Sequence, residues 1–439
     1  MATLQPYKKY NVVAYDYATS LPDGWQLLPN IAIFQERIER GYENEELLSV
    51  TIGRGVIKQS ELDKKDSSTL DKSKYLLVYP DDLVYSMRFR QGASGYSNYK
   101  GIVSPACTVL KPRKGVKLNS RYYYYMFRIG LYKNYVERYA YGIADGQMPL
   151  RYFDFKRMYS IVPPIEVQNK IVEYLDKKNS EIEKFVRNKE RLIEILEEQK
   201  VNVVNEHIKG FHTEKYFIDS ENEFIGKIPS GWSFKRLKHV AIVKGRIGFR
   251  GYTVQDIVGF GEGAITLSPS NVFNHKLILE ENTYLSWKKY YESPEIMIYE
   301  NDIVFVKTGS TIGKTALIPK TDEKMTLNPQ LVVFKKIRIN PEFLYFLFTT
   351  SYIQKIIELD IIGGAAGTLS QQKTKTIPVF FPDDKKQQLI VSMIKEEYSK
   401  IDVAINNARK EISSIKEYRE ALITDLVTGK RSIPQLQVS

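Results

Sequence analysis

The chain has 439 residues, 43% of them hydrophobic, and this length and composition predict two or three globular domains and exclude a largely disordered chain. Its 64 Lys and Arg outnumber its 52 Asp and Glu, and the formal charge of +12 suits a polyanionic partner such as nucleic acid. The only cysteine, Cys107, excludes an intrachain disulfide, and no window approaches the roughly 20 apolar residues of a membrane span, so we expect a cytoplasmic protein without a membrane partner.

Read in chain order, the sequence repeats itself. Leu21-Pro22-Asp23-Gly24-Trp25 returns as Ile228-Pro229-Ser230-Gly231-Trp232, at a shift of 207 residues. Tyr79-Pro80-Asp81-Asp82-Leu83 returns as Tyr299-Glu300-Asn301-Asp302-Ile303, at a shift of 220, and later positions keep a shift of 219. We therefore expect insertions inside the first part of the repeat and none in its second part.

Each repeat opens with a mixed segment, roughly residues 15–162 and 226–380. Both segments are rich in aromatic and β-branched residues between Gly, Pro, Asn and Asp, which predicts an α+β domain in each. Their clearest predicted elements are strands at residues 75–79 and 330–334 and helices at 122–135 and 342–359.

A long helical segment closes each repeat, at about residues 165–210 and 385–429. Apolar residues recur there every seven positions, and each helix would be about 60 Å long at about 1.5 Å per residue. The two stripes predict an antiparallel coiled coil that ends at Gly210 and Gly429; the alternative is that each stripe packs only on its neighbouring domain. The predicted seam residues are Leu175, Ile182, Phe185, Leu192, Leu196, Val203, Ile394, Ile401, Ala408, Ile415 and Leu422.

The predicted fold class is therefore α+β: two α+β domains separated by two long α-helices that pair as an antiparallel coiled coil, with a pseudo-two-fold internal repeat. The predicted boundaries are residues 1–162 for the first α+β domain, 163–225 for the first helical region and linker, 226–380 for the second α+β domain, and 381–439 for the second helical region.

The stretch Lys307-Thr308-Gly309-Ser310-Thr311-Ile312-Gly313-Lys314-Thr315 looks like a phosphate-binding loop, but its context excludes one. A Walker A loop needs a glycine where Thr308 stands, and a helix after it, whereas residues 316–318 read as a strand. Methyltransferase and nuclease motifs are also incomplete, and the four histidines show no ligand spacing. We expect no catalytic residue and no metal site in this chain.

The loops of the mixed domains carry a chemistry that suits DNA. Guanidinium and amide groups address base edges, while Lys, Ser and Thr bind phosphates. The predicted DNA-binding residues of the first domain are Arg88, Arg90, Gln91, Ser94, Tyr96, Tyr99, Arg138, Tyr141, Gln147 and Arg151. Those of the second are Lys244, Arg246, Arg250, Tyr252, Lys307, Thr308, Ser310, Thr311, Lys314, Thr368, Gln371, Gln372 and Lys373. Matching segments with different loops predict that the two domains read different sequences.

These features together resemble the specificity subunit of type I restriction-modification systems, over essentially the whole chain. The motifs that carry the resemblance are the two Pro-x-Gly-Trp openings, residues 302–305 leading into 311–314, Asn328-Pro329-Gln330, Pro163-Pro164-Ile165 at the entry of the first long helix, and residues 422–430 at the end of the second. One departure is that Pro382-Asp383-Asp384 replaces the double proline at the second entry, so the geometry of that entry is open.

The resemblance implies that each mixed domain is a target-recognition domain and that the paired helices set the spacer of a bipartite target in double-stranded DNA. It also implies that two methyltransferase subunits methylate adenine with S-adenosylmethionine, and that restriction subunits cleave unmodified DNA with ATP and Mg. No cofactor is expected in this chain. The first domain would read the 5′ half of the target and the second the 3′ half.

Two other functions compete with this interpretation. A single-chain nuclease or methyltransferase would need a complete cofactor motif, and would bind S-adenosylmethionine tightly as an isolated chain. A coiled-coil adaptor without DNA recognition would show no preference between DNA sequences and little dependence on salt.

Overall fold

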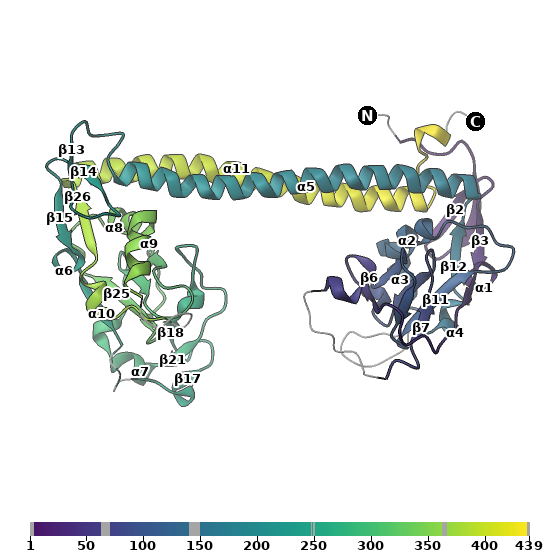
Figure 1. Ribbon diagram of the computed structural model, residues 1–439, viewed down its shortest axis with the longest axis horizontal. Helices are drawn as coiled ribbons and strands as arrows, with labels where there is room; N and C mark the ends of the chain where they lie inside the picture. The colour runs from purple at the N-terminus through teal and green to yellow at the C-terminus, as the bar shows by residue number, and fades with distance from the viewer. Residues whose placement is uncertain are drawn as a thin grey trace. The chain divides into compact units, whose positions relative to one another are not determined.

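The computed structural model describes residues 4–62, 71–139, 150–246, 248, 251–361 and 367–436. By their contacts, the residues form two units: unit 1 is Met1–Lys189 with Arg409–Ser439, and unit 2 is Glu190–Ala408. Each unit combines one α+β part with a portion of the long helices α5 (Ile165–Ile208) and α11 (Asp384–Val427) (Figure 1). Because this division cuts both helices, the four domain boundaries expected from the sequence stay a prediction.

The α+β part of unit 1 is centred on a four-stranded antiparallel sheet in the order β4-β11-β8-β9. The strands of unit 1 are β1 (Tyr10–Tyr15), β2 (Ala18–Pro22), β3 (Gln26–Pro29), β4 (Phe34–Glu36), β5 (Leu48–Thr51), β6 (Gly55–Lys58), β7 (Leu76–Val78), β8 (Leu83–Ser86), β9 (Ser94–Tyr96), β10 (Gly101–Val103), β11 (Cys107–Pro112) and β12 (Tyr159–Val162). Its shorter helices are α1 (Asn30–Ile33), η1 (Gln59–Glu61), η2 (Phe89–Gln91), α2 (Ser120–Arg128), α3 (Gly130–Val136), α4 (Tyr152–Phe155) and η8 (Pro434–Leu436).

Unit 2 repeats this plan with the four-stranded antiparallel sheet β16-β25-β22-β23. Its strands are β13 (Phe217–Asp219), β14 (Lys227–Pro229), β15 (Ser233–Arg236), β16 (Ile242–Gly245), β17 (Ile257–Val258), β18 (Gly263–Leu267), β19 (Val272–Phe273), β20 (Lys276–Leu277), β21 (Tyr284–Ser286), β22 (Ile303–Val306), β23 (Thr315–Leu317), β24 (Met325–Leu327), β25 (Leu331–Lys335) and β26 (Pro378–Phe381). Its shorter helices are α6 (Leu237–Val240), η4 (Val254–Asp256), η5 (Pro269–Asn271), α7 (Trp287–Tyr291), η6 (Pro294–Ile296), α8 (Pro341–Thr349), α9 (Ser351–Leu359) and α10 (Gln371–Thr374).

The two units differ mainly before their central strands. Unit 2 carries a second four-stranded sheet, β17-β21-β18-β24, in which β18 and β24 run parallel. The matching stretch of unit 1 forms the strand pairs β5–β6 and β10–β7. This difference accounts for the change in the repeat shift and confirms that the insertion lies in the first part of the repeat.

Both helices predicted in the mixed segments are interrupted. The helix expected at residues 122–135 divides into α2 and α3 at Ile129, and the helix expected at 342–359 divides into α8 and α9 at Thr350. Ile129 (φ −68°, ψ 148°) and Thr350 (φ −67°, ψ 146°) both have extended backbone, which ends a helix. The single-helix predictions were wrong at the same point of each repeat, so the break belongs to the shared scaffold.

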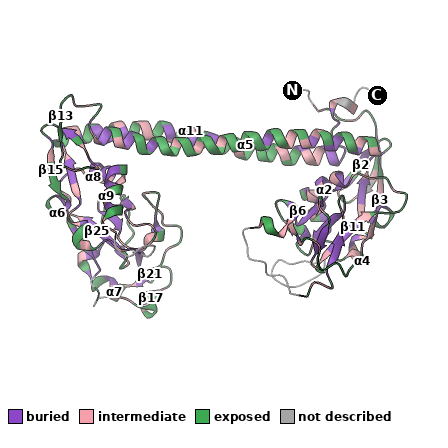
Figure 2. Ribbon diagram, viewed as in Figure 1, coloured by how far each residue is buried: buried purple, intermediate pink, exposed green. Residues whose placement is uncertain are grey.

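Buried residues gather on the central sheet and on helices α2 and α3 in unit 1, and on the central sheet and helices α8 and α9 in unit 2 (Figure 2). Many of these core residues are aromatic. In unit 1, Phe34 contacts Tyr123, Phe127 and Phe155, with ring centroids 5.0–6.0 Å apart. In unit 2 the rings of Phe305, Phe334 and Phe348 form the equivalent cluster, with centroids 5.1–6.0 Å apart. Burial of such large rings is the main apolar stabilisation of each unit.

The turn before the central strand is built in the same way in both units. The Asp82 carboxylate accepts a hydrogen bond from the Tyr79 amide at 2.8 Å, and the Asp302 carboxylate accepts one from the Tyr299 amide at 3.0 Å. The residue before each aspartate is left-handed: Asp81 (φ 68°) and Asn301 (φ 66°). Asp and Asn are the non-glycine residues that tolerate this conformation best, so the sequence selects the turn.

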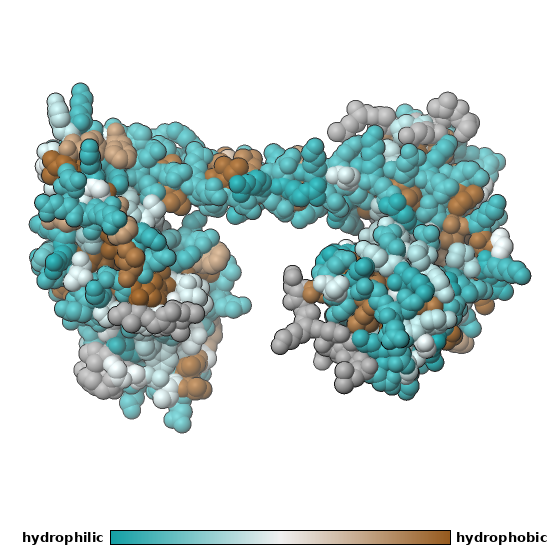
Figure 3. All heavy atoms as spheres, in the orientation of Figure 1, coloured by the Kyte–Doolittle hydropathy of each residue, from teal (hydrophilic) through white to brown (hydrophobic). Residues whose placement is uncertain are grey.

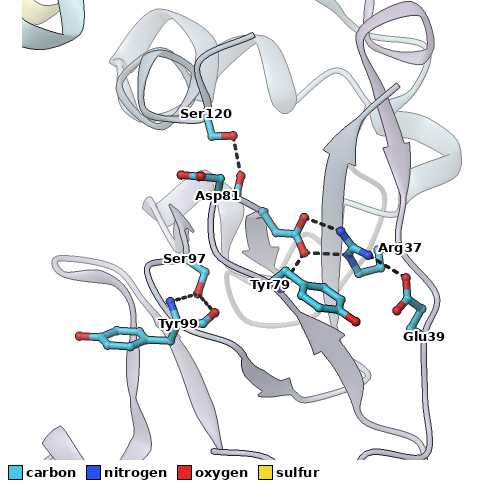
Figure 4. A network of polar contacts seen from close by, with 8 residues as sticks. Arg37, Glu39, Tyr79, Asp81, Ser97, Tyr99 and Ser120 are labelled. Carbon is cyan, nitrogen blue, oxygen red and sulfur yellow. Dashed lines mark hydrogen bonds and ion pairs between the residues drawn. The ribbon is translucent and has the colours of Figure 1, made fainter. Parts of the chain in front are cut away.

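The cation beside this turn comes from a different strand in each unit. In unit 1, Arg37 follows β4 and donates from Nε and Nη2 to the two carboxylate oxygens of Asp82, at 2.7 and 3.0 Å (Figure 4). In unit 2, Lys335 of β25 makes the ion pair with Asp302. Burial raises the pKa of both carboxyls, and the neighbouring cation opposes that rise.

The long helices pair antiparallel, as predicted. In unit 2, Lys200 of α5 makes an ion pair with Asp402 of α11, and His207 Nε2 lies 2.9 Å from Glu397 Oε1. In unit 1, Lys189 pairs with Glu411. The alternative that each stripe packs only on its neighbouring domain is wrong for the inner part of the seam, where Val203 packs with Ile401 and Ile405. It holds for the outer ends, where Ile171 and Leu175 join the core of unit 1.

The heptad prediction is correct for one seam position and wrong for the other. Phe185 and Leu192 are 37% and 39% exposed, and the inward positions are Val186 and Ile193, one residue later. After Ile182, the next inward-facing residue of α5 is therefore four positions away and the one after it three, whereas the prediction had spacings of three and then four. The remaining predicted seam residues are buried or half-buried: Leu175, Ile182, Leu196, Val203, Ile394, Ile401, Ala408, Ile415 and Leu422.

The ends of both helices follow the predicted signals. Gly210 (φ 70°) and Gly429 (φ 74°) are left-handed and stop α5 and α11. A Cβ on Gly429 would lie 2.6 Å from Cδ of Pro22, and one on Gly210 would lie 2.9 Å from Cζ2 of Trp232, so each helix end rests on a Pro-x-Gly-Trp opening of its own unit.

The two helix entries match in spite of the lost proline. Gln168 Nε2 donates to the Pro163 carbonyl and Gln387 Nε2 to the Pro382 carbonyl, both at 2.8 Å. At the second entry, the Asp383 carboxylate accepts a hydrogen bond from the Lys386 amide at 3.1 Å, as an N-terminal cap does.

Candidate nucleic-acid interface

The predicted DNA-binding loops of unit 2 come together at one edge. Loop 2, residues 307–314 between β22 and β23, contacts the segment before α10: the Leu369 amide donates to the Lys307 carbonyl at 2.8 Å, and the Gly309 amide to the Gly367 carbonyl at 3.2 Å. From α10, Gln371 Nε2 donates to the Val243 carbonyl in β16 at 3.0 Å. Three stretches distant in sequence therefore form one polar surface.

The side chains of this surface differ in what they expose. The exposed members are Lys244, Ser310, Gln372 and Lys373. The half-buried members are Tyr252, Lys307, Thr308, Thr311, Lys314, Thr368 and Gln371, and burial lowers the pKa of Lys307. Arg250 lies outside the described residues. The exposed amides, hydroxyls and ammonium groups are the groups that hydrogen-bond to base edges and phosphates.

Arg246 has a different place from the one its sequence position indicates. It is buried; its Nε donates to the Leu327 carbonyl at 2.9 Å and its Nη2 to Thr326 Oγ1 at 3.1 Å. Its guanidinium also lies over the Tyr252 ring, 5.3 Å from the centroid. These contacts join the end of β16 to β24, so the guanidinium supports the loop from inside the unit.

A hairpin turn beside loop 2 was not predicted from the sequence. Asn274 (φ 46°) and His275 (φ 58°) join β19 to β20, and Asn274 Oδ1 accepts a hydrogen bond from Lys314 Nζ at 3.5 Å. The Thr315 amide donates to His275 Nδ1 at 3.3 Å. Burial lowers the pKa of His275 to about 4, helped by the charge of Lys314, so the imidazole is neutral at pH 7. The sequence signal for this hairpin was the two-residue turn Asn274-His275 between two short strand-forming segments.

In unit 1, the predicted residues divide between two faces. Arg88, Arg90 and Gln91 are exposed on loop 1, residues 87–93 between β8 and β9. Arg90 makes an ion pair with Glu137 at the end of α3, and the adjacent Arg138 pairs with Asp16. Loop 1 therefore lies next to the segment that carries Arg138. Arg151 is exposed just before α4. Tyr141 and Gln147 lie outside the described residues.

The other three predicted residues of unit 1 are less accessible. Ser94 is buried, and Tyr96 and Tyr99 are half-buried. The Tyr96 ring packs on Tyr124 at 5.4 Å, and lines a cleft of about 440 Å³ that lies between α2, the β5–β6 turn and the ends of α5 and α11 within unit 1. Tyr96 thus faces the helices instead of the loop 1 surface.

The stretch that looks like a phosphate-binding loop leads into a strand, as the sequence predicts. Gly313-Lys314-Thr315 leads into strand β23, where a Walker A loop would need a helix N-terminus. Among the described residues, no three His, Cys, Asp or Glu side chains lie together in a way that could hold a metal ion. No helix within the described ranges is long and apolar enough to cross a membrane.

Residues 43–192 and 229–413, one stretch in each copy of the repeat, match the family of type I restriction modification DNA specificity domains. Two relatives come from Methanocaldococcus jannaschii. Its type I restriction enzyme MjaVIII specificity subunit is 22% identical over 370 residues, which cover 83% of this chain and 82% of the relative. Its MjaIX specificity subunit is 23% identical over 328 residues, which cover 74% and 72%.

Solved structures with the same fold belong to such systems too. One, from work on complex assembly and conformational transition of the type I R-M system, has a TM-score of 0.64 at 12% identity and covers 93% of this chain and 98% of that one. The HsdS subunit from Thermoanaerobacter tengcongensis has a TM-score of 0.52 at 12% identity, with the same coverage. The matched stretches make up more than half of the sequence. The chain therefore belongs to the family of type I restriction modification DNA specificity domains, and its role is that of a specificity subunit that recognises the DNA target.

Proposed function

We propose that this chain reads a bipartite target in double-stranded DNA, unit 1 the 5′ half and unit 2 the 3′ half, and catalyses no reaction itself. The observation that supports this most is the shared order of the sheets β4-β11-β8-β9 and β16-β25-β22-β23, with unlike side chains on the loops that follow β8 and β22. Loop 1 presents arginines and an amide, whereas loop 2 presents lysines and hydroxyls. One scaffold with two loop chemistries suits two readers of different sequences.

The paired helices α5 and α11 set the spacer between the half-sites and dock two methyltransferase subunits. On the face shown in Figure 3, hydrophilic side chains cover most of these helices. Phe185, Leu192 and Ile195 are nevertheless exposed on α5, and exposed apolar side chains on a polar helix surface suit a protein partner. The methyltransferase subunits use S-adenosylmethionine, and the restriction subunits use ATP and Mg for cleavage.

The central experiment maps methylated adenines in cells with and without this gene, alongside the methyltransferase subunits. We expect methylation within one bipartite motif that disappears with the gene. The complex should also lose affinity for DNA as salt rises, because Lys and Arg displace counterions from phosphates. A complex without sequence preference and with little dependence on salt would favour the coiled-coil adaptor.

Two further measurements test the remaining parts of the proposal. The isolated chain should not bind S-adenosylmethionine in calorimetry, and tight binding would contradict a non-catalytic role. Deletion of seven residues from α5 together with the facing seven of α11 keeps the seam in register and should change the spacer in the methylation map. An unchanged spacer would contradict the ruler function of the helices.

A further inference from the structure

Each recognition loop ends in a glycine with left-handed backbone, just before the next strand. Gly92 (φ 95°) ends loop 1 and Gly313 (φ 89°) ends loop 2. The strand register places them at equivalent points, because Tyr85 pairs with Ser94 and Phe305 pairs with Thr315. Only glycine adopts this backbone without strain, so both loops make the same sharp turn into the strand.

In unit 1, Arg128 at the end of α2 holds this turn. Its Nη1 donates to the carbonyls of Gly92 and Ser94 at 3.0 and 2.9 Å, and its Nη2 to the carbonyls of Ile52 and Gly53 at 2.6 and 3.2 Å. The guanidinium lies over the Tyr124 ring, 5.0 Å from the centroid. One side chain thus fastens the end of loop 1 to the β5–β6 turn and to helix α2.

In unit 2, Gln354 of α9 does the same with an amide. Its Nε2 donates to the carbonyl of Gly313 at 2.9 Å and to that of Phe348 at 2.6 Å. A Cβ on Gly313 would lie 2.7 Å from Gln354 Oε1 and 3.2 Å from Cγ2 of Ile357, so the amide sits directly against the turn. In both units, a side chain from a helix of the α+β part donates a hydrogen bond to the carbonyl of the left-handed glycine.

We propose that Arg128 and Gln354 are positioning residues for DNA recognition, each fixing the loop of its own unit. The inference rests on the proposed function. Nη1 and Nη2 of Arg128 and Nε2 of Gln354 are engaged with backbone carbonyls, and the side chains that face DNA are the exposed ones on the loops. Hydrogen bonds to base edges demand exact distances and angles, whereas phosphate contacts tolerate movement. Loss of a clamp therefore lowers discrimination more than affinity, and only at the half-site that its unit reads.

The test uses the full chain assembled with its methyltransferase subunits and the two half-sites that the methylation map defines. Arg128→Met and Gln354→Met remove the donors; methionine has the length of glutamine and keeps the apolar stem of arginine. We expect Arg128→Met to lower discrimination between the cognate and a singly substituted half-site by about tenfold on the unit 1 side, and Gln354→Met to do so on the unit 2 side. Each variant is the matched control of the other.

A conservative variant and the salt dependence separate positioning from direct contact. Arg128→Lys keeps the charge and some donors, so its loss of discrimination should lie between wild type and Arg128→Met. The slope of log affinity against log salt should stay unchanged in Arg128→Met; a slope reduced by about one would mean that Arg128 binds a phosphate, and would overturn the proposal.

Hydrogen exchange of the whole chain gives a readout that needs no DNA. Arg128→Met should speed amide exchange in peptides that contain residues 52–56 and 88–95, and Gln354→Met in peptides that contain residues 307–315. Unchanged exchange there, or relaxed preference at both half-sites in either variant, would overturn the positioning role. A wild-type complex without a bipartite preference would instead contradict the proposed function, while the exchange result would still decide whether the clamps hold the loops.

Discussion

Units 1 and 2 share a scaffold but fasten it with different side chains. On helix α2, Arg121 pairs with Asp176 of α5 at 2.6 Å; at the equivalent points of unit 2, Glu342 of α8 pairs with Lys395 of α11, with the charges exchanged. Farther along, Asn179 Nδ2 donates to the Tyr125 hydroxyl in unit 1. The matching residues of unit 2 are Tyr398 and Phe346, whose rings pack 5.8 Å apart.

This comparison teaches that backbone geometry is repeated while the contacts that hold it are exchangeable. A polar pair, a reversed ion pair and a ring contact each keep a helix of the α+β part against the long helices. An open polar cleft lies beside the polar version in unit 1, where Arg121 and Asn179 are among its lining residues. Equal backbone therefore does not imply equal surface or equal stability, and the two units should respond differently to equivalent changes.

The largest expected difference concerns the buried carboxylate before the central strand. Asp82→Ala removes the bidentate partner of Arg37, whose side chain is only 13% exposed and keeps Glu39 as an ion-pair partner, so we expect the free energy of unfolding to fall by about 3 kcal/mol. Asp302→Ala should cost less, about 2 kcal/mol, because the flexible Lys335 side chain can reach water. Denaturant titration measures both, and equal losses would contradict the distinction between the two cations.

The next difference is a histidine-dependent response to acid, which only unit 2 should show. All four histidines, at positions 207, 212, 239 and 275, belong to unit 2. The folded pKa of His275 is lowered to about 4 from 6.5, so its contribution is present above pH 6.5 and is lost as the pH falls from 6.5 through about 4. Because the His275 imidazole is partly exposed, we expect the free energy of unfolding to fall by only about 2 kcal/mol over this range.

His275→Gln is the control for this acid response. The variant should remove the histidine part of the slope of stability against pH, measured by denaturation at a series of pH values between 4 and 7. Peptides of unit 1 should show no change of hydrogen exchange between the variant and the wild type. A slope that is the same in both proteins would mean that another group is responsible.

The unlike loops should separate specificity from affinity. Arg88→Ala removes an exposed guanidinium of loop 1, and should cost about 1–3 kcal/mol of discrimination at the 5′ half-site alone. Lys314→Ala should weaken binding about equally on all sequences if its ammonium contacts phosphate. Competition binding with targets altered in one half-site measures both effects. If both variants keep wild-type affinity and preference, the assignment of these loops to DNA is wrong.

The smallest expected effect concerns the exchanged ion pairs. Arg121→Glu places two carboxylates side by side in unit 1, and the second change Asp176→Lys restores a pair with the polarity of unit 2. Because these side chains are 42% and 25% exposed, we expect a coupling of about 0.5 kcal/mol in a double-mutant cycle. A doubly changed protein less stable than both single variants would show that the local fields of the two units differ.

Several features could be predicted from the sequence because they depend on local chemistry. The repeated Gly210 and Gly429 end their helices as expected, and the heptads pair antiparallel. The second seam position was wrong because Phe185 and Val186 are both apolar, and only the partner helix decides which one faces inward. The breaks at Ile129 and Thr350 were missed because neither residue disfavours helix strongly.

Contacts between distant segments were beyond reach of the sequence. Arg246 and Arg88 look alike as loop arginines, yet one is buried beneath Thr326 and the other is exposed. Arg128 read as an ordinary helix residue, and its four carbonyl partners lie 34–76 residues away. Which loop residues touch bases stays a prediction.

The last described segment has a consequence for synthesis on the ribosome. Unit 2 is one continuous stretch, Glu190–Ala408, whereas unit 1 needs Arg409–Ser439 to close its core, to which Leu426 and Ile433 contribute. The Ser432 amide donates to the Gln5 carbonyl at 2.7 Å, so the end of the chain joins its beginning. At about 10 residues per second, the first part of unit 1, Met1–Lys189, waits some tens of seconds for its missing part. During that interval its apolar surface is a natural client for chaperones, and a message truncated after the codon for Ala408 would leave unit 2 whole and unit 1 open.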